Sequence, residues 1–225
     1  MKPAFWLEKW EKNEIGFHQQ EINSHLQVYW QHLKLKSGSP VFVPLCGKSS
    51  DMLWLCGQGH NVLGVEISAI AVGDFFQENA LNPHISQQGR FKRWETEGLA
   101  ILQGDFFDLN DLDVHDVGGV FDRASLVALP PELRQQYGQH LQHILPDNAA
   151  ILLVAFEYNQ SVMNGPPFSV AEDEIRLLYQ QSHETKLLFE QDVLDDNPRF
   201  RANGLDRLME KVYWLSPRQL AHDVL

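Results

Sequence analysis

Two stretches decide the fold of this chain: Val41-Phe42-Val43-Pro44-Leu45-Cys46-Gly47-Lys48 and Val62-Leu63-Gly64-Val65-Glu66-Ile67-Ser68. Each begins with a short apolar run, and a segment with helical spacing separates them. The first run ends at a glycine turn, and the second ends at a carboxylate, Glu66, nineteen positions after Gly47. This layout is typical of a βαβ nucleotide-binding unit, in which a backbone turn faces the cofactor and an acid binds a ribose.

Composition predicts an ordinary globular domain. A chain of 225 residues with 44% hydrophobic residues is expected to form one domain and to bury roughly 70–75% of its extended surface without a disulfide or metal. The net charge of −12 argues against binding to duplex nucleic acid, which requires Lys and Arg to neutralise phosphates. The same charge argues against anionic membranes.

Targeting and redox signals point to the cytoplasm. Cys46 and Cys56 lie in or beside one predicted helix, so we expect reduced thiols rather than a bridge, as in cytosolic proteins. The N-terminal stretch from Met1 to Trp6 has no apolar core of a signal peptide. No run approaches the about 18–20 apolar residues that span a bilayer.

Alternating strands and helices predict an α/β fold. Helices are expected over an N-terminal stripe of Phe5, Trp6, Trp10 and Ile15, and over about 22–33, 50–58, 68–81, 130–145 and 172–181. Strands are expected over about 41–44, 62–66, 91–94, 99–102, 117–122, 149–156, 185–193 and 208–215. This order favours a mostly parallel sheet with helices on both faces and an antiparallel C-terminal edge.

Ligands of such sheets bind beyond the C-terminal strand ends, which directs attention to the turn at Leu45 to Gly47. A phosphate-binding P-loop needs a glycine five positions before Gly47, where Phe42 stands. The dinucleotide fingerprint G-x-G-x-x-G fails at Leu45 and Ser50. The missing glycines disfavour nucleoside triphosphates, NAD and FAD, and leave an adenosine cofactor without a pyrophosphate. The alternative is that Gly47 only turns a loop.

Two acids follow predicted strands. A carboxylate at Glu66 can accept hydrogen bonds from both ribose hydroxyls, each contributing about 1.5–3 kcal/mol; the alternative is a solvated acid at a strand end. Asp105 can accept an adenine amino group, with Phe106 or Phe107 beside the ring. A helix N-cap role for Asp105 is an equal alternative.

Arg123 and Trp10 are candidates to contact charged parts of the ligands. The Arg123 guanidinium follows a strand and can bind the cofactor carboxylate or stabilise a negatively charged substrate. The alternative is a surface ion pair with Asp122. Trp6 is expected in the core, whereas Trp10 can contact a sulfonium cation through its aromatic face, worth about 0.5–2 kcal/mol.

Metal and hydrolase sites are not predicted. His18, His25 and His32 recur every seven residues, but without His-x3-His or Cys-x2-Cys spacing we expect solvated histidines and no metal. A Ser-His-Asp hydrolase is disfavoured because no Gly-x-Ser-x-Gly occurs.

The whole chain resembles the thiopurine S-methyltransferase family, and its bacterial members closely. The matching segments are Trp6-x3-Trp10, Ile15-Gly16-Phe17-His18-Gln19, Val43-Pro44-Leu45-Cys46-Gly47-Lys48, Gly59-His60-x-Val62-x-Gly64-Val65-Glu66-Ile67-Ser68, Phe121-Asp122-Arg123-Ala124-x-Leu126-Val127-Ala128-Leu129, Gly165-Pro166-Pro167-Phe168, Gly204-Leu205-Asp206 and Glu210-Lys211-Val212-Tyr213.

The resemblance implies a Rossmann-like class I methyltransferase that uses S-adenosylmethionine and releases S-adenosylhomocysteine. It implies that Trp10, Leu45, Glu66 and Arg123 contact the cofactor. The three aromatics and Gly16 between Trp6 and Phe17 predict an N-terminal helical lid over residues 1–36, which closes over a core of residues 37–225 when the cofactor binds. Substrate contacts are implied for Phe17, Arg123, Pro167, Phe168 and, with a looser match, Arg199; Arg201 is the alternative to Arg199. A monomer is also implied.

The implied reaction is attack of an aromatic or heterocyclic thiol sulfur on the cofactor methyl group. Such thiols lose a proton near neutral pH, so no general base is assigned, and Arg123 is expected to stabilise the anionic substrate. Two alternatives remain open. One is methylation of a selenium or tellurium oxyanion, an inorganic sulfur species or a halide. The other is a non-catalytic adenosine-binding module.

Overall fold

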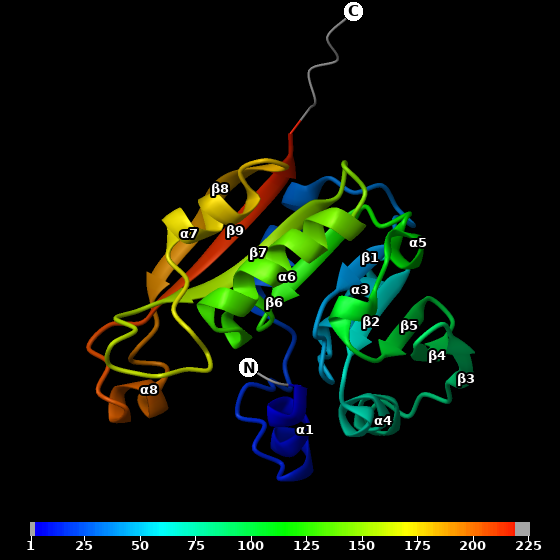
Figure 1. The fold of residues 1–225 in the computed structure, drawn as a ribbon, viewed down its shortest axis with the longest axis horizontal. Coiled ribbons are helices and arrows are strands. Elements are labelled where there is room, and N and C mark those ends of the chain that lie inside the picture. The colour runs from blue at the N-terminus through cyan, green and yellow to red at the C-terminus, as the bar shows by residue number, and fades with distance from the viewer. Residues whose placement is uncertain (1–2, 219–225) are drawn as a thin grey trace, which may run out of the picture.

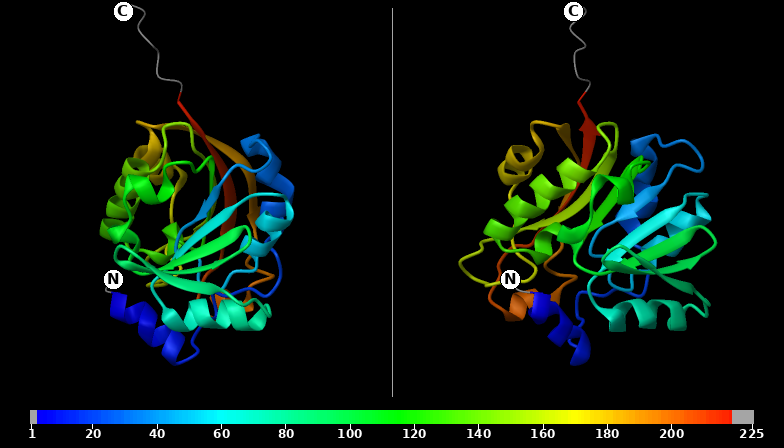
Figure 2. Two further views of the ribbon diagram at one scale, coloured as in Figure 1. Left: turned by 90° about the vertical axis from the view of Figure 1, so that its right-hand side faces the viewer. Right: turned by 45° about the vertical axis from the view of Figure 1, so that its right-hand side comes forward.

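One nine-stranded sheet forms the centre of the computed structural model, which describes residues 3–218 (Figures 1 and 2). Its strand order is β3-β4-β5-β2-β1-β6-β7-β9-β8. The strands are β1 (Val41–Val43), β2 (Val62–Glu66), β3 (His84–Gln88), β4 (Phe91–Thr96), β5 (Leu99–Gln103), β6 (Gly119–Arg123), β7 (Ala150–Glu157), β8 (His183–Asp192) and β9 (Met209–Pro217).

The helices precede, connect or follow these strands. They are α1 (Pro3–Glu11), α2 (Ser24–Tyr29), α3 (Asp51–Gly57), α4 (Ala69–Glu78), α5 (Asp111–Val114), α6 (Pro131–Ile144), α7 (Glu172–Tyr179) and α8 (Pro198–Ala202). Three 3-10 turns, η1 (Trp30–Leu33), η2 (Phe106–Asp108) and η3 (Leu126–Ala128), complete the set. None of the helices within residues 3–218 is long and apolar enough to cross a membrane.

The sheet is parallel at its centre and antiparallel at both edges. Strands β5, β2, β1, β6 and β7 run parallel, and β9 pairs antiparallel with both β7 and β8. This confirms the expected α/β sheet with an antiparallel C-terminal edge. The second antiparallel edge, β3-β4-β5, goes beyond the expectation, because β3 is largely exposed and carries little apolar pattern.

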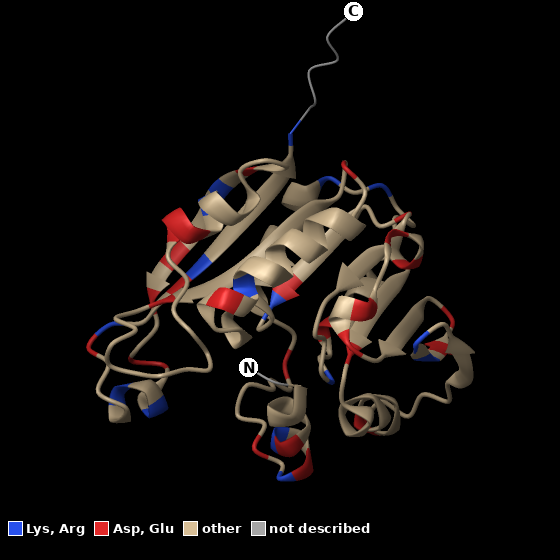
Figure 3. Cartoon of the chain, viewed as in Figure 1, with Lys and Arg blue, Asp and Glu red and all other residues tan. Residues whose placement is uncertain are grey.

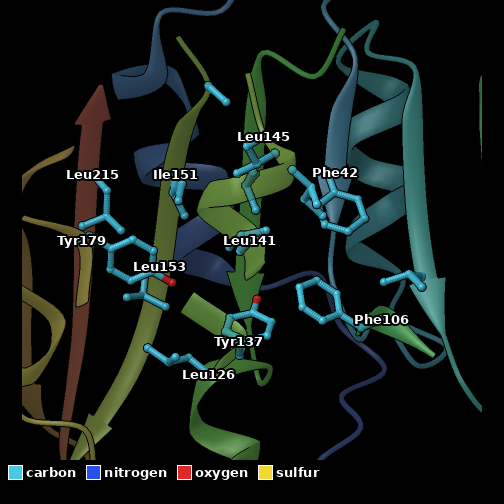
Figure 4. Packing of buried hydrophobic residues seen from close by; sticks show 14 of the residues in the cluster. Phe42, Phe106, Leu126, Tyr137, Leu141, Leu145, Ile151, Leu153, Tyr179 and Leu215 are labelled. Atoms are coloured by element: carbon cyan, nitrogen blue, oxygen red, sulfur yellow. The ribbon is translucent and has the colours of Figure 1, made fainter. Parts of the chain in front are cut away.

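Both faces of the central strands are buried, which explains their continuous apolar runs. Phe42 packs into the cluster that contains Tyr137 and Leu141 of α6 (Figure 4). Its neighbours Val41 and Val43 face the opposite cluster, which includes side chains of α2, α3 and α4. Charged side chains lie mostly outside these strands, with both signs interspersed along the chain (Figure 3).

Local capping sets the helix starts. Ser68 caps α4 as expected, because its Oγ accepts a hydrogen bond from the Ala71 N–H at 3.2 Å. The helix expected from residue 22 instead begins at Ser24, because the Asn23 side chain accepts from the Leu26 N–H. Helix α8, between β8 and β9, is an addition to the expected elements.

The histidines differ from the expectation. His18 precedes α2 rather than sharing its face with His25 and His32, and all three are partly buried. His25 Nε2 lies 2.9 Å from Glu210 Oε2. These rings are therefore not simply solvated, although residues 3–218 contain no cluster of three or more His, Cys, Asp or Glu side chains suited to a metal.

Gly64 provides a test of the packing between β2 and the loop after β1. A Cβ at this position would lie 2.7 Å from Cys46 Sγ and 3.0 Å from Met52 Sδ. We predict that Gly64→Ala lowers the free energy of unfolding by about 1–3 kcal/mol through overpacking. Denaturant unfolding is the measurement.

The control is Gly73→Ala, because Gly73 lies within α4 and a Cβ there meets no atom within 4 Å. This variant should be neutral or gain about 0.5–1 kcal/mol, since alanine favours the helix. Equal effects of the two substitutions would refute the packing argument.

Candidate active site

Four strand ends meet at one edge of the sheet, where β1, β2, β5 and β6 finish. Hydrogen bonds fix the loop after β1 between its neighbours. The Cys46 N–H donates to the Val65 carbonyl at 2.9 Å, and Ser125 Oγ donates to the Pro44 carbonyl at 2.7 Å. Hydrogen bonds therefore connect the loop after β1 to β2 and to the turn after β6, at the C-terminal strand ends where the sequence predicted a ligand site.

The loop after β1 has an unusual backbone. Leu45 has φ +45° and Gly47 has φ +53°, a region that strongly favours glycine and is uncommon for leucine. The Gly47 N–H donates to Glu66 Oε2 at 2.9 Å. The turn thus points an amide at the acid nineteen positions later, which gives Gly47 a role beyond that of a simple loop turn.

Glu66 is buried, and each of its two carboxylate oxygens accepts a hydrogen bond from a backbone N–H. Its side chain accepts from the Gly47 N–H through Oε2 and from the Ser68 N–H through Oε1 at 2.7 Å. The residue is only 6% exposed, so the alternative of a solvated acid is wrong. Burial raises the pKa of Glu66 to about 7, while the backbone N–H groups act in the opposite direction.

The N-terminal segment covers this loop. Trp10 is buried, and a carbon of its indole lies 3.2 Å from the place where a Gly47 Cβ would stand. The Phe17 ring packs edge-to-face on Trp6 and Trp10, with centroids 5.5 and 5.6 Å apart. In Figure 1, α1 accordingly lies at one edge of the sheet, between α8 and α4.

Arg199 and Arg201 lie on the same short helix, α8, but have different partners. The Arg199 guanidinium donates to the Gly16 carbonyl and lies over the Phe200 ring, 4.7 Å from its centroid. Arg201 pairs with Asp195 and is more than half exposed. Arg199 is therefore the arginine that meets the N-terminal segment.

Arg123 and Asp122 do not pair with each other. Asp122 is fully buried and accepts from Tyr137 Oη at 2.7 Å and from the Leu126 N–H at 3.2 Å. Burial raises the pKa of Asp122 to about 6. The expected alternative of a surface ion pair is wrong, because successive strand residues face opposite sides of the sheet.

The Arg123 guanidinium instead lies near a buried acid. Its Nη1 is 3.9 Å from Asp51 Oδ2, and its side chain is 14% exposed. Burial lowers the pKa of Arg123, and the charges of Asp51 and Glu210 oppose this shift. The site therefore holds a mostly buried cation at the end of β6.

The end of β5 differs partly from the expectation. Asp105 accepts from the Phe107 N–H at 3.0 Å and caps η2, which confirms its N-cap alternative. Phe106 is 3% exposed and packs on Tyr137 (Figure 4). Its ring belongs to the core, which does not fit the expected contact with adenine, whereas Phe107 is 39% exposed.

The loop that contains Pro167 and Phe168 reaches the end of β6. The Phe168 N–H donates to the Val127 carbonyl in η3 at 2.6 Å. Tyr158 Oη donates to the Pro167 carbonyl, also at 2.6 Å. The first bond attaches the expected pocket wall to the turn that follows Arg123, and the second attaches it to the residue after β7.

Three polar residues of this region were not assigned from the sequence. The sequence predicted no role in the site for Asp51 or Lys48, and His18 was expected to be solvated. Lys48 Nζ in fact lies 2.6 Å from Glu78 Oε1 of α4. Burial, together with the charges of Lys48 and Arg123, lowers the pKa of His18. No local pattern distinguishes these roles, since each depends on a distant partner.

Comparisons with known proteins agree with this geometry. The family model described as thiopurine S-methyltransferase matches residues 1–218. A thiopurine S-methyltransferase of Nitrosospira multiformis is 49% identical over 218 residues, covering 97% of this chain and 99% of the relative. One of Pseudomonas putida is 47% identical over 216 residues, covering 96% of this chain and all of the relative.

Solved structures show the same fold at low sequence identity. A Burkholderia thailandensis 1,6-didemethyltoxoflavin-N1-methyltransferase with bound S-adenosylhomocysteine has a TM-score of 0.62 and 15% identity, covering 95% of this chain and 87% of that chain. A SAM-dependent methyltransferase from Anabaena variabilis has a TM-score of 0.63 and 14% identity, covering 96% and 95%.

The chain belongs to the thiopurine S-methyltransferase family. The expected fold of a class I methyltransferase and the expected enzyme class, a methyltransferase that uses S-adenosylmethionine, are confirmed.

The raised pKa of Glu66 generates a pH prediction for cofactor binding. If ribose hydroxyls donate to this carboxylate, binding requires its ionised form. With a pKa of about 7 in the free protein, that form dominates above pH 7 and is lost as the pH falls below it. We predict that S-adenosylhomocysteine binds about tenfold more weakly at about pH 6 than at about pH 8, measured by calorimetry.

Glu66→Gln is the control for this prediction. The amide retains the size of the side chain but has no charge to lose, so binding should be weak and nearly independent of pH over this range. A wild-type affinity that does not change with pH, or an equal slope in the variant, would contradict the role of Glu66.

Proposed function

We propose that this chain transfers the methyl group of S-adenosylmethionine to the sulfur of an aromatic or heterocyclic thiol, with thiopurines within its substrate range. One observation carries the proposal. Glu66, bound by the Gly47 and Ser68 amides, lies at the end of β2 beside a loop that Trp10 covers. The names of relatives that match over nearly the whole chain support the acceptor class.

The residues at this edge fit an adenosine sulfonium cofactor. A carboxylate has about four acceptor positions, and the described residues use two of those of Glu66, so the ribose hydroxyls have acceptors left. The Trp10 face is suited to a cation. We assign the remaining cofactor contacts to the backbone at Leu45 and Gly47 and, for the adenine, to Asp105.

When bound, S-adenosylmethionine supplies an activated methyl group, so the protein mainly aligns the acceptor and excludes water. Trp10 and Phe17 close the site from the N-terminal side, and Pro167 and Phe168 form a wall near the end of β6. Arg123 stabilises the thiolate by its buried charge. Because heterocyclic thiols ionise near neutral pH, this mechanism uses no general base.

The buried Arg123 charge also favours a second group of acceptors. A cation that is largely shielded from solvent attracts small soft anions as well as aromatic thiolates. Selenium or tellurium oxyanions, with a role in metalloid detoxification, are therefore the second candidate. The relatives that match over nearly the whole chain are named as methyltransferases, which argues against the expected alternative of an adenosine-binding module without catalysis.

We further propose that residues 3–36 form a lid on a core of residues 37–218 in a cytoplasmic monomer. The ends of the two expected ranges, residues 1–2 and 219–225, lie outside the described residues. The contact of Arg199 with Gly16 supports a lid. The unpaired thiols of Cys46 and Cys56 support a reducing compartment. Val28, Leu112 and Leu177, among the most exposed large apolar side chains of the described residues, lie on separate helices, which supports a monomer.

An acceptor panel tests the proposed activity. Calorimetry should show binding of S-adenosylmethionine, and turnover should be higher with 6-mercaptopurine and other aromatic thiols than with tellurite or selenite. Turnover of the metalloid anions alone would favour the second candidate. Tight binding of S-adenosylhomocysteine without methylation of any acceptor would overturn the enzymatic proposal.

The two arginines of α8 offer a matched test of the lid. We predict that Arg199→Ala lowers kcat/KM for thiols about three- to tenfold, because it removes the bond to the Gly16 carbonyl, which at an exposed position is worth about 0.5–1.5 kcal/mol. Limited proteolysis should also show faster cleavage within residues 12–22.

Arg201→Ala removes only an exposed ion pair with Asp195, so kcat/KM and proteolysis should stay near wild-type values. If Arg201→Ala lowered kcat/KM more than Arg199→Ala does, Arg201 would be the arginine that holds the N-terminal segment.

A further inference from the structure

Asp51 is a buried acid to which no role has been given above. It is 2% exposed and forms the first residue of α3, four positions after Gly47. An acid in the first turn of a helix is favourable, because the helix N-terminus carries partial positive charge. A charge so deeply buried, however, is costly unless it has partners, and the identities of those partners indicate what it does.

Both carboxylate oxygens of Asp51 are engaged. Oδ1 accepts from the Asn23 N–H at 2.8 Å. Oδ2 accepts from Ser49 Oγ at 2.9 Å and lies 3.9 Å from Arg123 Nη1. One side chain therefore joins the segment before α2, the loop after β1 and the end of β6.

Asp51 is the acid that lies at ion-pair distance from the Arg123 guanidinium, and within residues 3–218 it supplies the one carboxylate at that distance. At 3.9 Å this contact is an ion pair without a hydrogen bond, and the guanidinium donates no hydrogen bond to any described side chain or carbonyl. A guanidinium has five N–H donors on a flexible stem. The pair with Asp51 restricts that stem while most of the donors stay available to a ligand.

The other contact of Asp51 leads to the lid. Asn23 caps α2 through its side chain, so its backbone N–H is held at the point where the N-terminal segment joins the helix. The same carboxylate that faces Arg123 thus fixes the base of the segment that carries Trp10 and Phe17.

We propose that Asp51 is a positioning residue, which holds the Arg123 guanidinium and the base of the N-terminal segment in one arrangement suited to methyl transfer. This inference rests on the proposed function. Preorganisation of this kind matters because a displacement of about 1 Å at a reacting centre can cost about a hundredfold in rate.

A double-mutant cycle tests the proposal. In the full-length protein, kcat and KM for 6-mercaptopurine are measured for wild type, Asp51→Asn, Arg123→Ala and the double variant. We expect Asp51→Asn to lower kcat roughly ten- to hundredfold, and to have a clearly smaller effect when Arg123 is already absent, because only the contact with the N-terminal segment then remains to be lost. An equal effect in both backgrounds would overturn the proposal.

Two further variants separate positioning from general stability. Asp51→Glu keeps the charge and should recover most of the lost activity. Glu132→Gln removes an exposed acid from the first turn of another helix, α6, and should leave activity unchanged. If Asp51→Asn fails to fold, Ser49→Ala replaces it in the same cycle with the same criterion. This variant removes the hydrogen bond that Ser49 Oγ donates to Asp51 Oδ2, the oxygen that faces Arg123.

A crystal structure of Asp51→Asn keeps this test independent of the substrate. The guanidinium of Arg123 should shift by about 1 Å or more, and an unmoved guanidinium would contradict the positioning role. If wild type methylates no acceptor, the proposed function fails, whereas the displacement of Arg123 still decides the role of Asp51.

Discussion

The buried carboxylate of Glu66, held by the Gly47 and Ser68 amides, is the interaction on which the rest of the site depends. It connects the loop after β1, the end of β2 and the start of α4 through one side chain. Desolvation makes an ionised acid costly at this point. The backbone bonds only partly offset that cost, so the carboxylate is prepared to accept further hydrogen bonds from a ligand.

The charges around the loop complement the proposed cofactor. Glu66 on β2 and Arg123 on β6 flank β1 from its two neighbouring strands, so a buried acid and a buried cation lie on opposite sides of the same loop. Trp10 covers the loop between them. The cofactor has a matching group for each: ribose hydroxyls for the Glu66 carboxylate, a sulfonium for the Trp10 face and a carboxylate for the Arg123 guanidinium.

The sequence predicted what local patterns encode. The apolar run from Val62 to Glu66 gave β2 with its observed bounds, and Ser68 was identified as a cap because capping is decided within one turn. Glu66 and Arg123 were identified as site candidates because parallel strands bring their C-terminal ends together.

What the sequence did not predict depends on distant partners. The burial of Phe106 results from its contact with Tyr137, thirty-one positions later. An ion pair between Asp122 and Arg123 could not be excluded from the sequence, because the actual partner of Asp122 is the distant Tyr137, which donates a hydrogen bond to it. The distinction between Arg199 and Arg201 rests on the Gly16 carbonyl, 183 positions before Arg199. Strand β3 is mostly polar and exposed, so it has no apolar pattern that would predict a strand. It forms because its backbone pairs with β4.

A crystal structure of the complex with S-adenosylhomocysteine would show whether the Glu66 carboxylate binds the ribose. We expect both ribose hydroxyls to lie within about 2.6–3.2 Å of the Glu66 carboxylate oxygens, with the hydrogen bond from the Gly47 amide retained and Trp10 over the cofactor. A ribose bound elsewhere, with Glu66 still contacting only the backbone, would contradict this expectation.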